Sequence, residues 1–211
     1  MELYKYPRTY HFPFSEGATS DDKILKDYSS FENKEIVITE KMDGENTSIY
    51  NNYFHARSLD SKHQLYHSWL AKFVSSMSYN IPENYRICGE YLYAKHSILY
   101  DNLKSYFYGF SIWKDNICLS WDETIEWFEM LDIIPVPILY RGKFDEEIVK
   151  RIARETVSRG REGIVVRLTD SFDYKDFSTS IAKYVRKNHI QTGQHWSNSE
   201  IIKNNLGKEV N

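Results

Sequence analysis

Lys41 stands two residues before an Asp-Gly turn in the segment Thr39-Glu40-Lys41-Met42-Asp43-Gly44-Glu45-Asn46-Thr47-Ser48-Ile49-Tyr50. Residues 35–39 before the turn are β-branched and apolar, and residues 47–50 after it alternate again. These patterns predict two strands joined through Asp43-Gly44. We therefore expect Lys41 at the end of a strand, where its side chain is held more rigidly than on a free loop.

A lysine in such a position can serve as a nucleophile. In a poorly hydrated cleft its ammonium group can lose the proton, and the neutral amine then attacks electrophiles. The alternative is an ordinary turn, because Asp-Gly often does no more than reverse the chain. The residues further along the chain decide between the two interpretations.

Five further motifs follow Lys41, each with a charged or aromatic residue in a strand-like run. They are Arg57 in His55-Ala56-Arg57-Ser58, Glu90 in Cys88-Gly89-Glu90-Tyr91, Phe110 in Tyr108-Gly109-Phe110-Ser111-Ile112-Trp113, Glu162 in Glu162-Gly163-Ile164-Val165-Val166-Arg167, and Lys183 in Ile181-Ala182-Lys183-Tyr184-Val185-Arg186. In this order, from about residue 34 to 189, the motifs resemble those of the covalent nucleotidyltransferases, the superfamily of ATP-dependent ligases and RNA capping enzymes. Within that superfamily they are most similar to the RNA ligases.

The resemblance implies a fold and a chemistry. The fold is an α+β nucleotidyltransferase domain, ATP-grasp-like, with mainly antiparallel sheets flanked by helices around a nucleotide cleft. In such a domain Lys41 would bond covalently to AMP from ATP, and Lys183 would contact the α-phosphate. Glu162 would bring a carboxylate to Mg²⁺ or Mn²⁺, and Glu90 would contact the ribose hydroxyls or the water network around the metal.

The same resemblance assigns residues to the base and sugar. Phe110 would stack on the purine, with Ile164 or Val165 against its other face. Arg57 would contact the ribose or a substrate phosphate, and Glu40 or its backbone would help to read the base edge.

Structural roles are the alternatives for these residues. They are a surface position for Arg57, a salt bridge from Glu90 to Arg86 or Lys95, a core position for Phe110, and a helix-end or strand-edge carboxylate for Glu162.

The chain departs from the family pattern in two places. Ser111 stands where many relatives carry an acidic residue. Most relatives also have Lys-x-Lys at the last motif, but Val185 follows Lys183 here at the second lysine's position. Arg186 or Lys187 is then the candidate replacement.

The remaining segments are expected to form scaffold. Apolar spacing and capping residues predict helices at 63–77, 120–131, 144–159 and 197–205. Strands are expected at 53–58, 85–93, 105–113, 117–119, 135–140, 162–168 and 183–187, with loops at 94–100 and 169–180. His63 and His67 stand one helical turn apart, as metal ligands can, but no acidic ligand is near and solvent-facing histidines are expected.

The length of 211 residues predicts one domain spanning 1–211. It would comprise an N-terminal packing segment, 1–34, a motif-bearing core, 35–188, and a short helical tail, 189–211. With so short a tail, a separate oligonucleotide-binding (OB-fold) domain is not expected. A hydrophobic fraction of 41%, with 16% aromatic residues, indicates a globular protein.

Charge and cysteine content bear on partners and compartment. The net charge of −3 gives no global attraction to nucleic acid, so RNA binding would need a local basic patch or a partner protein. Cys88 and Cys118 lack metal-type spacing and are expected to be free thiols. With neither a signal peptide nor a membrane span, a cytoplasmic location is expected.

The sequence thus predicts an ATP-dependent RNA ligase, acting in RNA repair, that joins an RNA 5′-phosphate to a 3′-hydroxyl. A GTP-dependent capping enzyme and a DNA ligase remain alternatives from the same superfamily. A catalytically silent nucleotide- or RNA-binding module is the alternative from another class.

Overall fold

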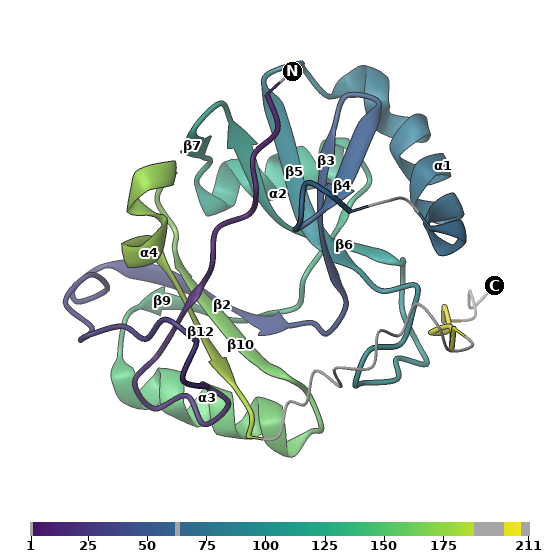
Figure 1. Ribbon diagram of the computed structural model, residues 1–211. Coiled ribbons are helices and arrows are strands. Elements are labelled where there is room, and N and C mark those ends of the chain that lie inside the picture. The colour runs from purple at the N-terminus through teal and green to yellow at the C-terminus, as the bar shows by residue number, and fades with distance from the viewer. Residues whose placement is uncertain (1, 62–63, 188–200, 208–211) are drawn as a thin grey trace.

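The computed structural model describes residues 2–61, 64–187 and 201–207. The chain forms two sheets, and the longer helices cover their outer faces (Figure 1). Residues from both sheets line a cavity between them, which is called the hollow below. Most ladders are antiparallel, which confirms the predicted α+β class.

The lower sheet in Figure 1 has five strands within the described residues, in the order β1-β12-β10-β2-β9. Their bounds are β1 Tyr10–His11, β2 Glu35–Lys41, β9 Ile138–Lys143, β10 Gly163–Leu168 and β12 Ile181–Val185. Strand β1 pairs with β12 in parallel, so the first and last strands of the described chain are neighbours.

The upper sheet follows the order β11-β7-β6-β5-β3-β4, and β8 pairs in parallel with β6. Its strands are β3 Glu45–Tyr50, β4 Tyr53–Ala56, β5 Tyr85–Tyr91, β6 Phe107–Lys114, β7 Ile117–Cys118, β8 Ile134–Pro135 and β11 Phe172–Asp173. Strands β2 and β3 belong to different sheets, so the short link after Lys41 carries the chain from one wall of the hollow to the other.

Alternation along the lower sheet separates a core face from a polar face. One set of side chains, which includes Ile38, Ile164 and Val166, is buried against helix α3, Glu146–Ser158. The intervening residues face the hollow. They are Thr39, Lys41, Val165, Arg167 and Lys183.

Four α-helices occur in the described residues: α1 Ser68–Met77, α2 Trp121–Met130, α3 Glu146–Ser158 and α4 Phe177–Ser180. Single 3₁₀ turns occupy Leu65–His67, Ser78–Asn80 and Tyr174–Asp176. Helices α1 and α2 cover the upper sheet, and α2 begins with the predicted capping box of Ser120 and Glu123. None of the helices in the described ranges combines the length and apolar character that crossing a bilayer requires.

A third buried cluster joins the two sheets. It contains Tyr6, Cys88, Trp113, Cys118, Phe172, Phe177 and Ile181. Both cysteines are buried free thiols, as predicted, and burial raises the pKa of Cys118 to about 11. The N-terminal segment, purple in Figure 1, runs from the upper sheet down to the lower one and contributes Tyr6 to this cluster.

Two segments differ from the sequence prediction. In one the chain passes from one sheet to the other, and in the other a predicted loop contains short regular elements. The strand predicted at 135–140 is divided: β8 joins the upper sheet and β9 the lower, and Pro137, which lacks an N–H, lies between them. The loop predicted at 169–180 contains β11 and α4. Its buried Phe172 and Phe177 anchor these short elements to the third cluster.

The predicted terminal helix, 197–205, starts outside the described residues, and its described part, 201–205, is not helical. The side chain of Asn204 explains this difference. Its amide nitrogen donates to the carbonyl of Leu92 at 2.8 Å, and its oxygen accepts from the N–H of Tyr100 at 2.9 Å. These bonds hold the segment extended along 92–103.

Candidate active site

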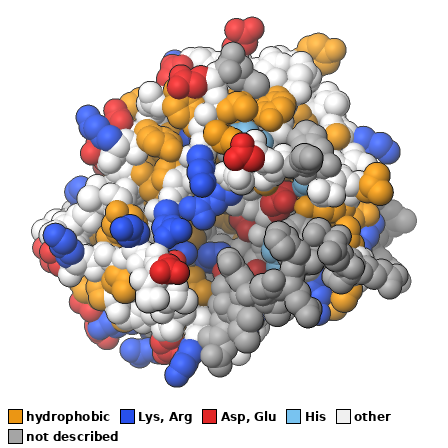
Figure 2. Space-filling model, in the orientation of Figure 1, with side chains coloured by type: hydrophobic (Ala, Val, Ile, Leu, Met, Phe, Trp, Pro, Cys, Tyr) orange, Lys and Arg blue, Asp and Glu red, His pale blue; other side chains and the backbone are white. Residues whose placement is uncertain are grey.

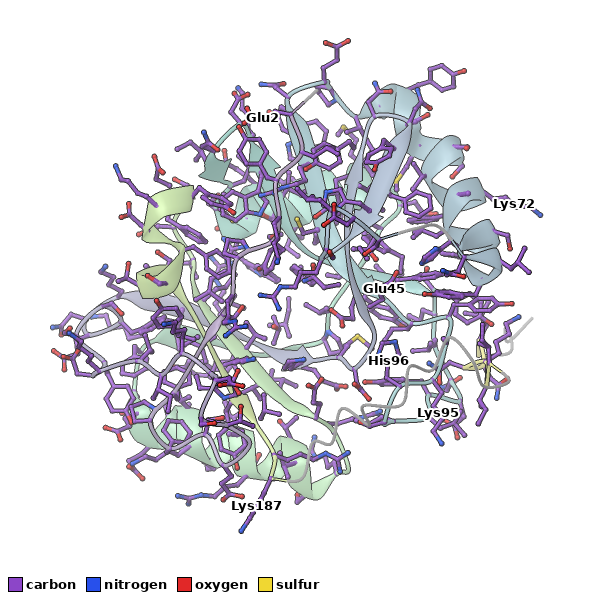
Figure 3. All side chains as sticks on the ribbon, in the orientation of Figure 1. Glu2, Glu45, Lys72, Lys95, His96 and Lys187 are labelled. Carbon is purple, nitrogen blue, oxygen red and sulfur yellow. The ribbon has the colours of Figure 1, made fainter. Side chains whose placement is uncertain are left out.

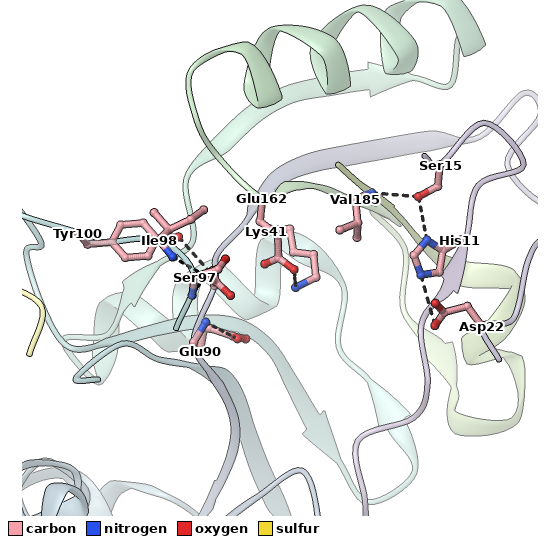
Figure 4. Close-up of polar contacts among 12 residues, drawn as sticks. His11, Ser15, Asp22, Lys41, Glu90, Ser97, Ile98, Tyr100, Glu162 and Val185 are labelled. Atoms are coloured by element: carbon pink, nitrogen blue, oxygen red, sulfur yellow. Dashed lines mark hydrogen bonds and ion pairs between the residues drawn. The ribbon is translucent and has the colours of Figure 1, made fainter. Parts of the chain in front are cut away.

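Lys41 ends β2, and its partner in the ladder with β10 is Gly163. Glu162 directly precedes that partner, which brings its Oε1 to 2.7 Å from Lys41 Nζ (Figure 4). The Glu162 side chain is only 1% exposed. The prediction that Lys41 lies at the end of a strand is therefore confirmed. The pairing of β2 with β10 places the carboxylate of Glu162 beside it.

The ion pair with Glu162 affects the protonation of Lys41. Burial by itself would lower the Lys41 pKa, but the charges of Glu162 and Glu90 outweigh it and raise the pKa above the usual value. The ion pair therefore favours the ammonium form of Lys41, whose side chain is partly buried while that of Glu162 is fully buried.

Lys183 lies on the same face of the sheet as Lys41. It is the ladder partner of Val165, which in turn pairs with Thr39 on β2. Burial lowers the Lys183 pKa, and the nearby charge of Lys41 lowers it further. Val165 lines the cavity, whereas Ile164 is fully buried on the α3 side, so only the former can touch a base from this strand.

Glu90 faces the lysines from the upper sheet. Its Oε1 accepts a hydrogen bond from the N–H of Gly44 at 3.1 Å. Burial raises the Glu90 pKa to about 8, with Glu162 adding to the shift and Lys41 opposing it. A Cβ at Gly44 would lie 2.5 Å from the carbonyl oxygen of Tyr91, so this close approach requires glycine.

The alternative salt bridge from Glu90 to Arg86 or Lys95 is absent among the described residues. Arg86 instead donates to the carbonyl of Tyr4 at 2.8 Å and stacks over Trp113.

Asp43 does more than form the turn. Its Oδ2 accepts from the N–H and hydroxyl of Ser97, both at 2.7 Å, and from the N–H of Ile98 at 2.8 Å (Figure 4). The N–H of Asp43 donates to the hydroxyl of Tyr100 at 3.0 Å. Burial would raise the Asp43 pKa, but these hydrogen bonds lower it below the usual value. The loop at 94–100 is thereby fixed beside Lys41.

Arg57, Phe110 and Glu40 all line the same cavity as Lys41. Arg57 follows β4 and donates from Nε to the carbonyl of Tyr6 at 3.4 Å. Phe110 is partly buried with its ring edge-on to Tyr6, at 5.2 Å between centroids. The carboxylate of Glu40 lies 3.6 Å from Nε of Arg161.

The cavity has a volume of about 1090 Å³ and is lined from both sheets and from the N-terminal segment. Its size suits a nucleotide. Figure 2 shows basic side chains gathered in the hollow, with acidic ones deeper. The basic lining residues are Arg8, Lys41, Arg57, Lys95, Arg167 and Lys183.

Sequence reasoning missed a polar network in the N-terminal segment. The hydroxyl of Ser15 accepts from the N–H of Val185 at 3.0 Å and lies 2.8 Å from His11 Nδ1 (Figure 4). His11 Nε2 is 3.5 Å from Asp22, and His11 pairs with Lys183 in the β1–β12 ladder. Burial and the charge of Lys183 lower the His11 pKa to about 4. No local motif marks these residues, because the ladder alone brings them to the site.

His67 is buried, contrary to the expected solvent-facing position. Its Nδ1 accepts from the N–H of Gln64 at 2.9 Å, so Nε2 carries the hydrogen that is donated to Glu45 at 2.8 Å. The long-range contact with Glu45 explains the burial. Glu45 and His96 line the cavity and flank its right-hand side in Figure 3. His63 lies outside the described residues.

The departure at the last motif has a structural outcome. Val185 lines the cavity, but neither Arg186 nor Lys187 does. Lys187 is exposed and points outward at the bottom of Figure 3. The missing second lysine is therefore not replaced within the cavity from this segment.

A divalent metal fits the carboxylates present only if the nucleotide shares in binding it. Within the described ranges, no three His, Cys, Asp or Glu side chains gather as a metal site. Mg²⁺ is commonly held by one or two carboxylates together with phosphate oxygens and water, so Glu162 and Glu90 match that pattern.

Comparison with known proteins identifies similar sequences and folds. The sequence model of the RNA ligase family matches residues 34–185. No curated protein matches the chain at a significant level.

Three solved structures illustrate the shared fold. An archaeal ATP-dependent RNA ligase has a TM-score of 0.62 at 15% identity, covering 87% of this chain and 48% of that one. A mutant of the Naegleria gruberi RNA ligase with ATP and Mn has a TM-score of 0.58 at 16% identity, covering 87% and 62%. A protein described as a putative ATP-dependent DNA ligase from Aquifex aeolicus has a TM-score of 0.58 at 20% identity, covering 87% of this chain and 50% of that one. The chain thus spans about half the length of the archaeal ligase.

Proposed function

The chain belongs to the RNA ligase family, and from that premise we propose that it is an ATP-dependent RNA ligase that works through a lysyl-AMP intermediate on Lys41. The observation that carries the proposal is the ion pair of Lys41 and Glu162 at 2.7 Å, on the same cavity wall as Lys183. A nucleophile, a carboxylate and a second cation on one wall are the groups that nucleotidyl transfer needs.

The first step forms a P–N bond. The neutral amine of Lys41 attacks the α-phosphorus of ATP, and the bond from that phosphorus to the pyrophosphate oxygen breaks. The Lys41 pKa is raised in the ion pair, so Lys41 must first leave Glu162 and release its proton to solvent water before the amine can attack. Lys183, a second positive charge on the same face, favours that loss and stabilises the oxygens of the α-phosphate.

Mg²⁺ or Mn²⁺, held by Glu162 and Glu90 together with nucleotide phosphate oxygens, would neutralise negative charge on the reacting phosphates. Phe110 and Val165 lie at opposite walls of the cavity, on β6 and β10, and we assign them to the two faces of the adenine. Arg57 is assigned to the ribose or a phosphate, and Glu40 to the base edge.

The later steps transfer AMP and seal the strand. An oxygen of the RNA 5′-phosphate attacks the phosphorus of lysyl-AMP, and the P–N bond breaks as Lys41 leaves. The RNA 3′-hydroxyl then attacks the 5′-phosphorus, so that a phosphodiester forms and AMP departs. RNA repair in the cytoplasm is the setting we propose for this reaction.

The test is transfer of label. The chain is incubated with α-labelled ATP or, separately, α-labelled GTP in the presence of Mg²⁺, and label is sought on the denatured polypeptide. We expect label from ATP, its release by pyrophosphate, and sealing of RNA that carries a 5′-phosphate and a 3′-hydroxyl.

Other outcomes would identify the alternatives. Label from GTP alone would indicate a capping-type enzyme, and sealing of DNA in preference to RNA would indicate a DNA ligase. A chain that binds ATP or RNA but never takes up label would be a silent binding module and would refute the proposal.

A further inference from the structure

A second, shallower groove adjoins the active-site cavity. It has a volume of about 410 Å³ and lies between the N-terminal segment and the region of α4. Pro7 and Arg8 line both hollows, so the groove meets the cavity at these residues.

The lining of the groove is strongly basic. It contains Arg8, Lys23 and Lys175 and, among the described residues, no carboxylate. Arg57 adds a fourth cation on the cavity side of Arg8. None of these four residues forms an ion pair with any part of the chain that the structure describes. In a chain with a net charge of −3, these four cations form a local positive patch, although Asp21 and Asp22 line the cavity near Arg8.

The two arginines are held in place by backbone carbonyls. Arg8 donates from Nη1 to the carbonyl of Asp21 at 2.7 Å, and Arg57 donates from Nε to the carbonyl of Tyr6 at 3.4 Å. Their guanidinium groups are close enough for the charge of Arg8 to add to the effect of burial in lowering the Arg57 pKa. Such a pair of like charges is relieved when a phosphate binds between them.

Aromatic rings accompany the cations. Tyr10 and Tyr174 line the groove and are partly buried, and Phe177 also lines it and is buried. The Tyr174 hydroxyl donates to the carbonyl of Lys5 at 2.8 Å, which fixes its ring. Basic residues that follow a phosphate backbone, next to rings on which bases can stack, are the usual elements of single-strand nucleic-acid sites.

We propose that this groove binds a single-stranded RNA segment leading to the reacting end in the cavity. Lys23 and Lys175 contact its phosphates, and Arg8 and Arg57 contact the phosphate nearest the cavity. The inference rests on the proposed function, because it takes RNA as the substrate. An acidic peptide could pair with the cations, but its carboxylates would not stack on the aromatic rings of the groove as bases can.

The test measures RNA binding by the full chain. The probe is a fluorescein-labelled, 5′-phosphorylated oligo(U) RNA, and its anisotropy is followed across a salt series. Replacing Lys23→Ala together with Lys175→Ala should weaken binding about tenfold at 0.1 M salt and lower the slope of log K against log salt by about 1.4, since each single-strand phosphate contact contributes about 0.7.

Matched controls separate a local site from a general loss of charge. Lys72→Ala with Lys143→Ala removes the same charge from exposed positions outside both hollows and should bind as the unaltered chain does. Lys23→Arg with Lys175→Arg keeps the charge and should also bind normally. Thermal unfolding of each variant verifies that it is folded.

Two results would overturn the inference. One is RNA binding by the Lys23→Ala/Lys175→Ala variant with the affinity and slope of the Lys72/Lys143 control. The other is that the Lys23→Ala/Lys175→Ala variant loses binding to a fluorescent polyglutamate peptide but keeps its binding to RNA. That result would assign the groove to an acidic protein partner.

The outcome is distinguishable from that of the proposed function. Transfer of label from ATP to the unaltered chain needs no RNA, so it reports on the function alone. If the chain takes up label but the groove variant keeps its RNA affinity, only this inference fails. If the chain takes up no label while the variant loses RNA affinity, the ligase proposal fails and the RNA groove remains.

Discussion

Lys41 Nζ lies 2.7 Å from the Oε1 of Glu162, whose side chain is 1% exposed. This contact favours the protonated form of the proposed nucleophile, whose side chain is partly buried. It also couples the proposed role of Lys41 as nucleophile to that of Glu162 as metal ligand, because a metal that binds the Glu162 carboxylate changes the pKa of Lys41.

Lys41→Arg should abolish transfer of label from ATP. The guanidinium can keep the ion pair with Glu162, so the fold should persist, but it does not lose its proton and cannot form the phosphoramidate. Gel autoradiography after denaturation measures the result, with Lys72→Arg on α1 as the matched control. Normal labelling of the Lys41 variant would remove it from the mechanism.

Glu162→Gln should slow label transfer by orders of magnitude, because it removes the carboxylate assigned to the metal. It should also shift the residual activity toward lower pH. Glu162 raises the Lys41 pKa in the unaltered chain, so its loss lowers that pKa and the amine becomes neutral at lower pH. Single-turnover rates across a pH series measure both effects, and an unchanged pH midpoint would contradict the coupling.

Lys183→Ala should reduce label transfer about 100-fold or more, since it removes a charge that stabilises the phosphate oxygens. Lys187→Ala is the control, because that side chain is exposed and does not line the cavity. Equal rates for the two variants would show that Lys183 does not act on the phosphate.

Asp43→Asn should lower the free energy of unfolding by about 1–3 kcal/mol, because its charge-assisted hydrogen bonds to residues 97 and 98 weaken. The Asp43 pKa is lowered in the folded chain. The stability that the ionised Asp43 carboxylate contributes is therefore complete above the unfolded pKa of about 3.9. It disappears as the pH falls through the folded pKa. Urea titrations at several pH values test this, with exposed Asp60→Asn as the control.

The unaltered chain should lose stability as the pH rises, because of Glu90. The Glu90→Gln variant should not show this loss. The folded pKa of Glu90 is raised to about 8, so between the unfolded value of about 4.3 and 8 the folded chain holds a proton that the unfolded chain releases. Stability contributed by the neutral acid falls across that window. The difference in unfolding free energy between the two chains should grow from pH 5 to about 8, and a constant difference would refute the assignment.

Local sequence signals predicted the elements of the site well. Lys41 does end a strand, and the hairpin through Asn52, which has φ 56°, forms as expected. Helix α2 starts at its capping box, and α3 ends just before Gly160, which has φ 79°. Each of these features depends on residues within a few positions of one another.

Contacts between distant segments could not be predicted. Asp43 is anchored by a loop at 97–98, Glu45 by His67, and His11 reaches Lys183 only through the β1–β12 ladder. The Lys41 pKa likewise depends on Glu162, far away in the sequence. Spacing and periodicity carry no information on such pairs, so the sequence did not predict that Glu162 raises the Lys41 pKa.

The parallel ladder of β1 with β12 sets an order of events on the ribosome. Tyr10 and His11 are synthesised early, but their partners Ala182 and Lys183 emerge late. Until then the lower sheet lacks its β12 strand, and a nascent chain that already contains Lys41 and Glu162 still lacks Lys183. The proposed active site is therefore complete only once β12 has paired with β1, and a chain that ends before residue 183 should not take up label from ATP.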